Sequence, residues 1–547
     1  MNNKIFSKLF NGIVVGILIL YAVEVRAQWL SKSAEKRLQR HVAFLASDKL
    51  EGREPGTDGI EKAARYIASE FKKAGLKPAG DSLWFQYFEL PVNPSDYKVN
   101  VHLNGKVWAD FKGFALPYSA SGEFTGAVYY MAQPDTVARV SLGGMALAVE
   151  LKPLATHQAH HRHPDYLDMV RWAERKGAKA LIFVDNHGIQ PGFSEFKTTD
   201  KFFRTSLLCL FAGPGLSKAL SDGGGQLHLT VRRPNPVRSA NVIGFWDNKA
   251  PTTVVIGAHY DHLGRNHPGS RSEVPGQIHN GADDNASGTA GLFALARVLR
   301  RPEFKGNNYL FIAFTAEESG LLGSAWFVRS PLFSKYTFNY MLNMDMIGRL
   351  HQQLAISGVG TSPVWGNNIN TLRTEGFTVK TSASGVGPSD HTSFYYKNIP
   401  VLHFFTGLHE DYHKPSDDAD KINYAGMRQV LNLMLDLVAT LNNQGRLPFE
   451  KTRDQEDTPT PRFKVTLGIM PDYLYDGKGI RVEGVVPGKP ADKAGLRGGD
   501  IILAIGAHET PDMTTYMKAL ASFEKGDTTP VRVLRNGAEQ VMEVEFK

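Results

Sequence analysis

Cysteine is nearly absent from this chain: its 547 residues include one, Cys209. A single cysteine forms no internal disulfide, and none stands at the end of the N-terminal apolar segment, where a lipid anchor would be attached. Cys209 lies in the apolar stretch SLLCLF, which indicates a buried packing residue and not a nucleophile. Disulfide-rich scaffolds and cysteine-linked lipoproteins are therefore excluded.

A strong excess of one charge is also absent. The chain has 62 Lys and Arg against 55 Asp and Glu, and its net charge of +7 is spread thinly, with no long basic block. It contains no aromatic-basic RNA motif, no recognition-helix pattern and no internal repeat. The small surplus affects solubility and non-specific contacts, and we expect no nucleic-acid partner.

A long hydrophobic run occurs at the N-terminus, in MNNKIFSKLFNGIVVGILILYAVEVRAQ. Lys4 and Lys8 precede the apolar stretch 10–23, and residues 25–27 form a small-residue cleavage site. This pattern predicts a secretory signal peptide over residues 1–27, too short for a comfortable membrane span. We expect an exported protein, periplasmic or extracellular, with no stable membrane span after cleavage. Retention of the segment as an anchor is the alternative.

The rest of the chain is too long for one hydrophobic core, and its pattern of apolar and polar residues changes along its length. Residues 28–112 carry two amphipathic helical patterns, and 113–237 carry short strand-like pieces around one helix. Residues 238–445 alternate apolar strands with helices, 446–461 form a polar linker, and 462–547 are compact and strand-rich. The predicted fold is α/β, with a mixed, mostly parallel sheet covered by helices on both faces, a β-rich inserted domain and a C-terminal β domain.

Chemically reactive side chains stand where the apolar strands end. In an α/β sheet, ligands bind beyond the carboxyl ends of the strands, so these side chains are expected at one edge. Imidazoles and carboxylates are the ligands that suit zinc. Taken singly, each residue has an ordinary explanation as a helix cap, a polar turn or a satisfied histidine. Together they indicate a metal site, and they are His259, Asp261, His262, Asp283, Asp284, Glu317, Glu318, Asp345 and His413.

The motifs around these residues follow a recognisable order: GAHYDH, NGADDNASG, TAEESG, NMDMIG, SDHTSF and DYHKPSDD. This set resembles the co-catalytic zinc aminopeptidases, whose fold is shared by the glutamate carboxypeptidases and the transferrin receptor ectodomain. The resemblance covers the helices after the signal segment and nearly all of residues 241–442. It implies a hydrolase that acts on peptide bonds.

The resemblance also implies a ligand set for two Zn²⁺ per chain. His259 and Asp345 would hold one zinc, Glu318 and His413 the other, and Asp284 would bridge them. Asp284 is preferred over its neighbour because it stands three residues before the Ser-Gly pair, the spacing of the family. The peptide bond after this aspartate is usually cis in the family.

The adjacent glutamates then have different tasks. Glu318 binds metal, whereas Glu317 stays unligated and acts as general base and acid. Asp261 resembles the family's carboxylate that orients the ligating imidazole. For Asp417 and the Asp390-His391 pair, ordinary hydrogen bonding is expected.

We therefore expect a secreted zinc exopeptidase, an aminopeptidase that releases N-terminal residues from peptides. A carboxypeptidase or dipeptidase of the same fold is the alternative, because Arg265 and Arg271 stand in the loop between the first two motifs and would suit a substrate carboxylate. A cyclase similar to glutaminyl cyclase, with a single zinc, and a non-catalytic receptor-like relative are further alternatives. The cyclase would need fewer metal ligands than the motifs supply, and the receptor-like relative would have lost some of these ligands.

The flanking domains have resemblances of their own. The segment 113–237 resembles the protease-associated domain found in such enzymes, and its histidine-rich run 157–163 is expected to be an exposed loop. The stretch AGLRGGDIILAIG within 462–547 resembles a PDZ domain, which binds a peptide C-terminus by adding it as a strand. Pro471 stands where the recognition strand should start and donates no hydrogen bond there. A weak protein or peptide ligand is therefore expected.

Overall fold

The computed structural model describes residues 28–546 except for short gaps. The predicted signal segment, the histidine-rich run 157–163 and most of the predicted linker lie outside the described residues. Within the described part, no helix is both long and apolar enough to cross a membrane. The gaps are 91–96, 109–112, 133–139, 152–165, 189–202, 236, 268, 273, 373, 453–464, 472–474, 476, 486–487, 512–514, 517–518 and 521.

The main domain is built on a nine-stranded sheet of order β1-β11-β13-β12-β14-β17-β15-β16, with β2 paired to β11. Its centre is parallel: β12 pairs with β13 and with β14, and β14 pairs with β17. Antiparallel pairs β11–β13 and β15–β17 flank this centre. The strands are β1 Lys77–Pro78, β2 Phe85–Glu89, β11 Arg238–Trp246, β12 Thr253–His259, β13 Asn308–Phe314, β14 Phe338–Met344, β15 Gln353–Ser357, β16 Thr378–Ser382 and β17 Val401–Phe405.

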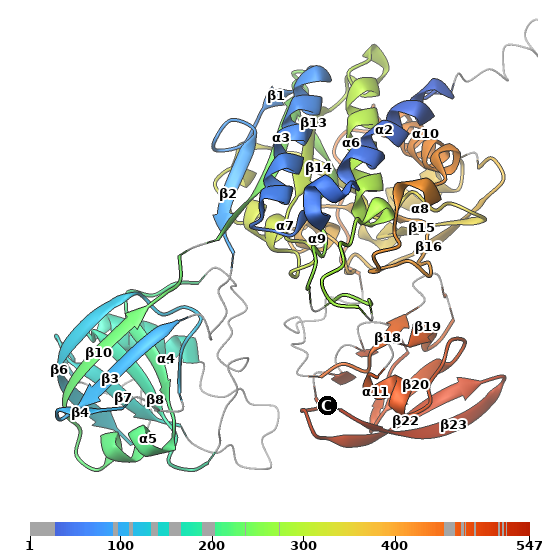
Figure 1. The fold of residues 1–547 in the computed structure, drawn as a ribbon. Coiled ribbons are helices and arrows are strands. Elements are labelled where there is room, and N and C mark those ends of the chain that lie inside the picture. The colour runs from blue at the N-terminus through green and yellow to red at the C-terminus, as the bar shows by residue number, and fades with distance from the viewer. Residues whose placement is uncertain are drawn as a thin grey trace, which may run out of the picture. The chain divides into compact units, whose positions relative to one another are not determined.

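Helices cover both faces of this sheet, which is why its central strands are apolar along their whole length. Side chains alternate between the faces: Val254 and Ile256 join one core, whereas Val255 joins the other. Helices α2, α3, α6 and α10 pack on the first core (Figure 1), and α7 and α9 on the second. Their bounds are α2 Ser33–Leu45, α3 Asp58–Lys73, α6 Gly288–Val298, α7 Leu322–Phe327, α8 Val364–Ile369, α9 His391–Tyr395 and α10 Tyr424–Leu441. The predicted fold class is confirmed.

Local sequence explains where the long helices begin and end. Thr57 caps α3 by accepting from the amide of Ile60, and acidic residues in the first turn and lysines in the last match the helix dipole. Asn423 caps α10 in the same way, with its side chain 2.9 Å from the amide of Gly426. The two amphipathic patterns expected near the N-terminus are α2 and α3.

The inserted domain is a separate compact unit, spanning Phe88–Ser239 among the described residues. Its eight-stranded sheet has the order β4-β3-β10-β6-β7-β8-β9-β5, parallel from β6 to β9. Strand β3, Lys98–Leu103, pairs with β10. These residues therefore belong to the inserted domain, whereas the predicted boundary at residue 113 places them in the main domain. The remaining elements are β4 Lys106–Val107, β5 Phe114–Ala115, β6 Gly122–Met131, β7 Ala146–Glu150, β8 Ala180–Val184, β9 Leu208–Ala212, β10 Gly225–Arg232, α4 Tyr166–Arg175 and α5 Pro214–Ser221.

The C-terminal domain has its own core and a sheet of order β18-β19-β20-β22-β23, with β21 paired to β20. Strand β18 stands at the end of this order, and Pro471 lies within it opposite Val482. The elements are β18 Ile469–Pro471, β19 Ile480–Val485, α11 Pro490–Lys493, β20 Ile501–Ile505, β21 His508–Glu509, β22 Thr528–Arg535 and β23 Ala538–Glu545.

Candidate metal centre

The carboxyl ends of the parallel strands bring the predicted residues together. His259 ends β12, Asp345 follows β14, and the two glutamates follow β13. His413 comes from the loop after β17. Asp284 lies in the wide turn Ala282–Ser287 that precedes α6, and its peptide bond to Asn285 is cis, as the resemblance implied. The side chains meet because parallel strands end at the same edge of the sheet.

One cluster of ligand atoms surrounds His259. Its Nε2 lies 3.2 Å from Asp345 Oδ1 and 3.4 Å from Asp284 Oδ1. The imidazole is 1% exposed, so these contacts are made away from bulk water. His259, Asp284 and Asp345 form a group whose ligand atoms lie within 4.8 Å of one another.

A second cluster uses the other oxygen of Asp284. His413 Nε2 lies 3.2 Å from Asp284 Oδ2 and 3.3 Å from Glu318 Oε2. His262 also reaches these carboxylates: its Nδ1 lies 2.8 Å from Glu318 Oε1 and 3.8 Å from Asp284 Oδ2. His262, Asp284 and Glu318 lie within 4.8 Å of one another. The sequence placed His262 among the residues at the strand ends, but the ligand set implied by the resemblance did not include it.

The spacings fit a tetrahedral metal. Two ligands of one zinc, each bound at about 2.0–2.1 Å, lie about 3.4 Å apart. The contacts of His259 with its two carboxylates, and of His413 with Asp284 and Glu318, are 3.2–3.4 Å. The 2.8 Å contact of His262 is instead the length of an ordinary hydrogen bond to Glu318.

The neighbouring Asp283 faces another direction. Its Oδ1 accepts from the amide of Gly348 at 2.6 Å, and its Oδ2 lies 3.2 Å from His409 Nε2. Asp417 accepts from the amides of both aspartates, Asp283 at 2.9 Å and Asp284 at 3.1 Å. Hydrogen bonding therefore holds this turn in shape, and Asp284 is the aspartate that faces both clusters.

The carboxylate of Asp261 contacts the glutamates more directly than it contacts His259, whose Nδ1 lies 3.3 Å from the backbone oxygen of Asp261. Its Oδ1 accepts from the amide of Glu317 at 3.1 Å, and its Oδ2 accepts from the amide of Glu318 at 3.3 Å. Its Oδ1 lies 3.8 Å from His259 Nδ1, beyond hydrogen-bond length. Burial raises the pKa of Asp261 to about 7. Through its contacts with the two amides, the carboxylate of Asp261 orients the turn that carries both glutamates.

Arg53 is a buried cation that the sequence prediction also missed. It is 1% exposed, and its guanidinium donates to the carbonyls of Tyr260 at 2.7 Å, Asn280 at 2.7 Å and Gly281 at 3.0 Å. A further bond, 2.5 Å long, goes to Leu45 at the end of α2. Burial lowers its pKa to about 10 even though nearby carboxylates oppose the shift. One side chain thus ties together the backbone segments that precede Asp261 and Asp284.

The two adjacent glutamates differ in proton affinity. Burial raises the pKa of Glu317 well above its ordinary value, and the charges of Glu318 and Asp345 add to this against the effect of His259. Burial would also raise the pKa of Glu318, but the imidazoles of His413 and His262 lower it well below its ordinary value. One carboxyl is therefore suited to exchanging a proton, and the other to remaining an anion.

The long loop after β12 borders the centre. Arg265 is exposed and donates to Gly276 O at 3.1 Å, with Glu51 Oε1 at 3.4 Å. The guanidinium carbon of Arg271 lies 4.9 Å from the ring centre of Tyr412, and its amide donates to His413 O at 3.0 Å. The loop therefore supports the segment that carries His413.

Comparison with known families identifies two segments of the chain. Residues 241–438 match Peptidase family M28, and residues 452–546 match the PDZ domain. The first range runs from within β11 to within α10 and includes every residue of the two clusters. The chain therefore carries a domain of peptidase family M28 followed by a PDZ domain, which confirms the resemblances drawn from the motifs.

Individual relatives cover parts of the chain. Aminopeptidase YwaD of Bacillus subtilis (strain 168) is 31% identical over 304 residues, which are 49% of this chain and 58% of that protein. Leucine aminopeptidase 1 of Leptosphaeria maculans is 35% identical over 142 residues, 25% of this chain and 35% of that protein. The solved zinc aminopeptidase BSAP from Bacillus subtilis is 23% identical with a TM-score of 0.41, over 78% of this chain and 97% of that one. The chain spans less than two thirds of the length of both curated relatives.

Metal content separates the roles of the two histidines in the second cluster. We expect His413→Ala to lower the zinc content by about one ion per chain, because its Nε2 has the spacing of a tetrahedral ligand. The matched variant His262→Ala should keep the wild-type content, since its contact is a hydrogen bond. Elemental analysis after dialysis against micromolar zinc measures both. The reverse pattern would make His262 the ligand.

Proposed function

We propose that the chain is an exported zinc aminopeptidase with a dinuclear site. The observation that carries the proposal is the division of Asp284: Oδ1 faces His259 and Oδ2 faces His413. A carboxylate with one oxygen in each of two ligand clusters is the arrangement of a bridging ligand. In this proposal His259 and Asp345 hold one zinc, and Glu318 and His413 hold the other. Zinc ions bound there supply Lewis-acid chemistry at the scissile carbonyl.

Glu317 is the proton carrier in this proposal. Glu317 is 8% exposed, follows β13 directly before Glu318, and belongs to neither cluster. It takes the proton from the attacking water and gives it to the leaving amine. Its raised pKa suits this exchange, because a carboxyl of ordinary pKa would hold the proton too weakly near neutral pH. Asp261 keeps it in place through the amide of Glu317.

Attack at the N-terminus is favoured over the alternatives. The relatives named above are aminopeptidases. Arg265 points at Glu51 and the carbonyl of Gly276, so it does not offer a free guanidinium to a substrate carboxylate. A cyclase with a single zinc would have no use for a second cluster. The preferred substrate is therefore a peptide with a free α-amine.

The PDZ domain supports a second, weaker peptide contact. Strand β18 stands at the end of the described strand order, the position from which a PDZ domain adds a peptide as a further strand. Pro471 within β18 has no N–H to donate, and a missing hydrogen bond of this kind costs about 1 kcal/mol. We infer a docking module for substrate or another exported protein.

Glu317→Gln tests the proton carrier. The substitution keeps the side-chain shape and removes the base, so turnover should fall by roughly 10²–10⁴ while zinc content is unchanged. Glu318→Gln is the matched control, and it should lose metal as well as activity. Steady-state kinetics and elemental analysis on the same preparations provide the measurement. Near-normal turnover of a zinc-replete Glu317→Gln protein would refute the assignment.

Blocked peptides test the direction of attack. A panel of peptides with a free α-amine should lose residues one by one from the N-terminus, and N-acetylation should abolish the reaction. Mass spectrometry of the products distinguishes the two ends. Release from the C-terminus of acetylated peptides would instead establish the carboxypeptidase alternative.

Removal of residues 458–547 tests the role of the PDZ domain. Because the ligand clusters lie within residues 259–413, hydrolysis of small chromogenic substrates should stay within about twofold of the full chain. Activity on longer peptides should decrease, because the docking contact is lost. A truncated protein that keeps its fold and zinc but loses small-substrate turnover would contradict this division of labour.

A further inference from the structure

Tyr412 connects His413 to the loop that follows β12. The ring of Tyr412 stacks on the imidazole of His413, with ring centres 3.8 Å apart and planes inclined by 28°. The guanidinium carbon of Arg271, which belongs to that loop, lies 4.9 Å from the centre of the tyrosine ring. His413 meets Asp284 and Glu318 through Nε2. Tyr412 therefore supports the imidazole without being a member of the ligand cluster.

The backbone of His413 requires such support. Its φ is 57°, in the left-handed region that few residues other than glycine adopt. None of the other four proposed ligands, all of them described, has a positive φ. A conformation of this kind persists where the surrounding contacts over-determine it. The position of His413 therefore depends on its neighbours more than that of the other ligands does.

The loop after β12 supplies two further contacts to His413. The Nδ1 of His413 lies 3.1 Å from the carbonyl oxygen of Gly269, and the amide of Arg271 donates to the carbonyl of His413 at 3.0 Å. A carbonyl oxygen only accepts, so Nδ1 carries the proton and Nε2 is the nitrogen left for a metal. The loop thus holds both the backbone and the tautomer of His413.

The loop 264–279 is anchored by contacts of its own. Its ends are joined where the amide of His279 donates to the carbonyl of Gly264 at 2.9 Å. Among its described residues, Ser270 also contacts His279, with 2.7 Å between Oγ and Nε2. His279 is 1% exposed, so these bonds are made away from bulk water. The contacts to His413 therefore come from a segment that is itself held in place.

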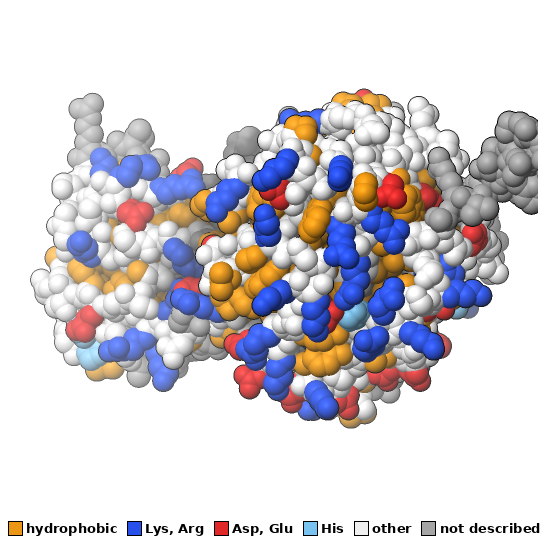
Figure 2. All heavy atoms as spheres, turned by 90° about the horizontal axis from the view of Figure 1, so that it is seen from above, with side chains coloured by type: hydrophobic (Ala, Val, Ile, Leu, Met, Phe, Trp, Pro, Cys, Tyr) orange, Lys and Arg blue, Asp and Glu red, His pale blue; other side chains and the backbone are white. Residues whose placement is uncertain are grey.

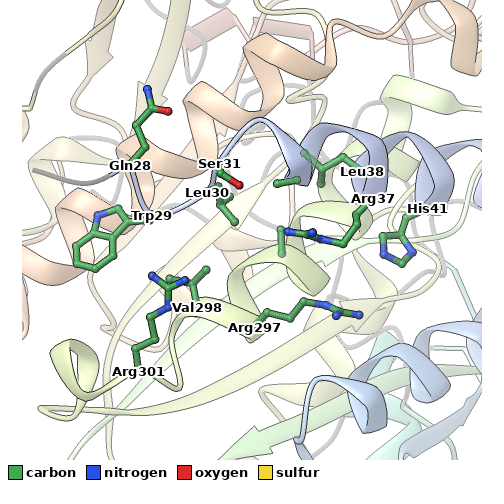
Figure 3. Close-up of a pocket in the computed structure, with 12 residues that line it drawn as sticks. Gln28, Trp29, Leu30, Ser31, Arg37, Leu38, His41, Arg297, Val298 and Arg301 are labelled. Atoms are coloured by element: carbon green, nitrogen blue, oxygen red, sulfur yellow. The ribbon is translucent and has the colours of Figure 1, made fainter.

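Arg271 differs from the cations at the surface of the molecule. Figure 2 shows one face on which many Lys and Arg side chains stand at the surface. Arg37 and Arg301 line a cavity of about 270 Å³ at the C-terminal end of α6, and Arg271 is not part of that lining (Figure 3). Arg271 is half-buried and lies over the ring of Tyr412, whose negative face attracts a guanidinium. Its charge is thus directed at the aromatic ring that supports His413.

We propose that Tyr412 and Arg271 are positioning residues that set the zinc affinity at His413. The inference rests on the proposed function, because it takes His413 as a zinc ligand. Tyr412 holds the plane of the imidazole, and Arg271 holds both the tyrosine ring and the backbone of His413. Removal of groups that orient a ligating histidine weakens metal binding by roughly 10- to 100-fold.

The other proposed zinc position is supported in a different way. His259 ends β12, so its backbone is fixed by the central part of the sheet. Its Nδ1 lies 3.3 Å from the backbone oxygen of Asp261, close to it in the same segment. Loss of Tyr412 or Arg271 should therefore weaken one zinc position and leave the other unchanged.

This assignment gives Arg271 a role other than binding a substrate carboxylate. A guanidinium that binds substrate affects KM at every zinc concentration. A guanidinium that positions His413 affects activity only while the zinc position is incompletely filled, because excess metal restores occupancy by mass action. Excess zinc therefore distinguishes the two roles.

Zinc titration of the full chain carrying Tyr412→Leu or Tyr412→Phe tests the proposal. Competition with a zinc indicator should show two ions bound by the wild type, one of them bound roughly 10- to 100-fold more weakly by Tyr412→Leu. Tyr412→Phe keeps the aromatic ring and should bind both ions as the wild type does. The absorption spectrum of the Co²⁺-substituted proteins should change for the leucine variant only, and this readout does not depend on activity.

A double variant tests whether Tyr412 acts through His413. In a chain that already carries His413→Ala, adding Tyr412→Leu should cause no further loss of zinc affinity, because the residue through which it acts is absent. An additional loss of the same size as in the wild-type background would contradict a positioning role.

Arg271→Gln and its matched control Arg265→Gln remove the same charge from one loop. Arg271→Gln should weaken the same zinc position as Tyr412→Leu, and its turnover of peptides with a free α-amine should return to the wild-type value at saturating zinc. Arg265→Gln should leave both zinc positions unchanged, because Arg265 donates to the carbonyl of Gly276 and not toward His413. A defect of Arg271→Gln that persists at saturating zinc would assign this residue to substrate binding instead.

Two further outcomes would overturn the proposal. One is a Tyr412→Leu protein with the zinc affinities of the wild type, or with both positions weakened equally. The other is a Tyr412→Phe protein as weak as Tyr412→Leu, which would assign the effect to the hydroxyl. Failure of the proposed function has a different signature: the wild type would not cleave peptides with a free α-amine, while the zinc affinities of the variants would still differ. Thermal unfolding midpoints of the metal-free proteins verify that each variant is folded.

Discussion

The main domain depends on the stabilisation of several carboxylates that lie close together and away from water. The carboxylates of Asp261, Asp284, Glu317, Glu318 and Asp345 gather at one edge of the sheet and are almost fully buried or half-buried. Buried charges of one sign are costly unless opposite charges or hydrogen bonds accompany them. Here imidazoles lie between the carboxylates, and although burial opposes it, Glu318 and Asp284 raise the pKa of His413 to about 10. Metal ions in the two clusters would supply the same compensation.

Arg53 and backbone amides add a buried positive charge and hydrogen-bond donors near these carboxylates. Arg53 donates only to carbonyl oxygens in the contacts described above, so it stays a buried cation within the field of the carboxylates. Asp261 and Asp417 in turn accept from the amides of the residues that follow β13 and precede α6. The ligand-bearing turns are therefore shaped by hydrogen bonds that do not need a metal. This supports a centre whose geometry is set before zinc binds.

Much of the centre was predictable from the sequence, because strand ends and their carboxyl edges follow from apolar runs. The motifs predicted that His259, Glu318, Asp345 and His413 would meet around Asp284, and the contacts bring them together. The contact of Asp261 with His259 was predicted less well: its carboxylate accepts from the amides of the glutamates, and its backbone oxygen is the atom that lies within hydrogen-bond length of His259 Nδ1, at 3.3 Å. The limit of the inserted domain was also misplaced, since the pairing of β3 with β10 joins segments far apart in the chain.

The sequence by itself determined the fold class and the residue types at the strand ends: an α/β sheet, imidazoles and carboxylates of the kind that suit zinc, and two adjacent glutamates. These follow from residue type and local pattern. Only the tertiary structure decided that His413 takes a ligand spacing while His262 takes a hydrogen bond, and that Arg53 lies beneath the centre. It also decided that Arg37 and Arg301 share a cavity. Such choices depend on distances between segments remote in the chain, which strand register and helix packing set and local sequence does not.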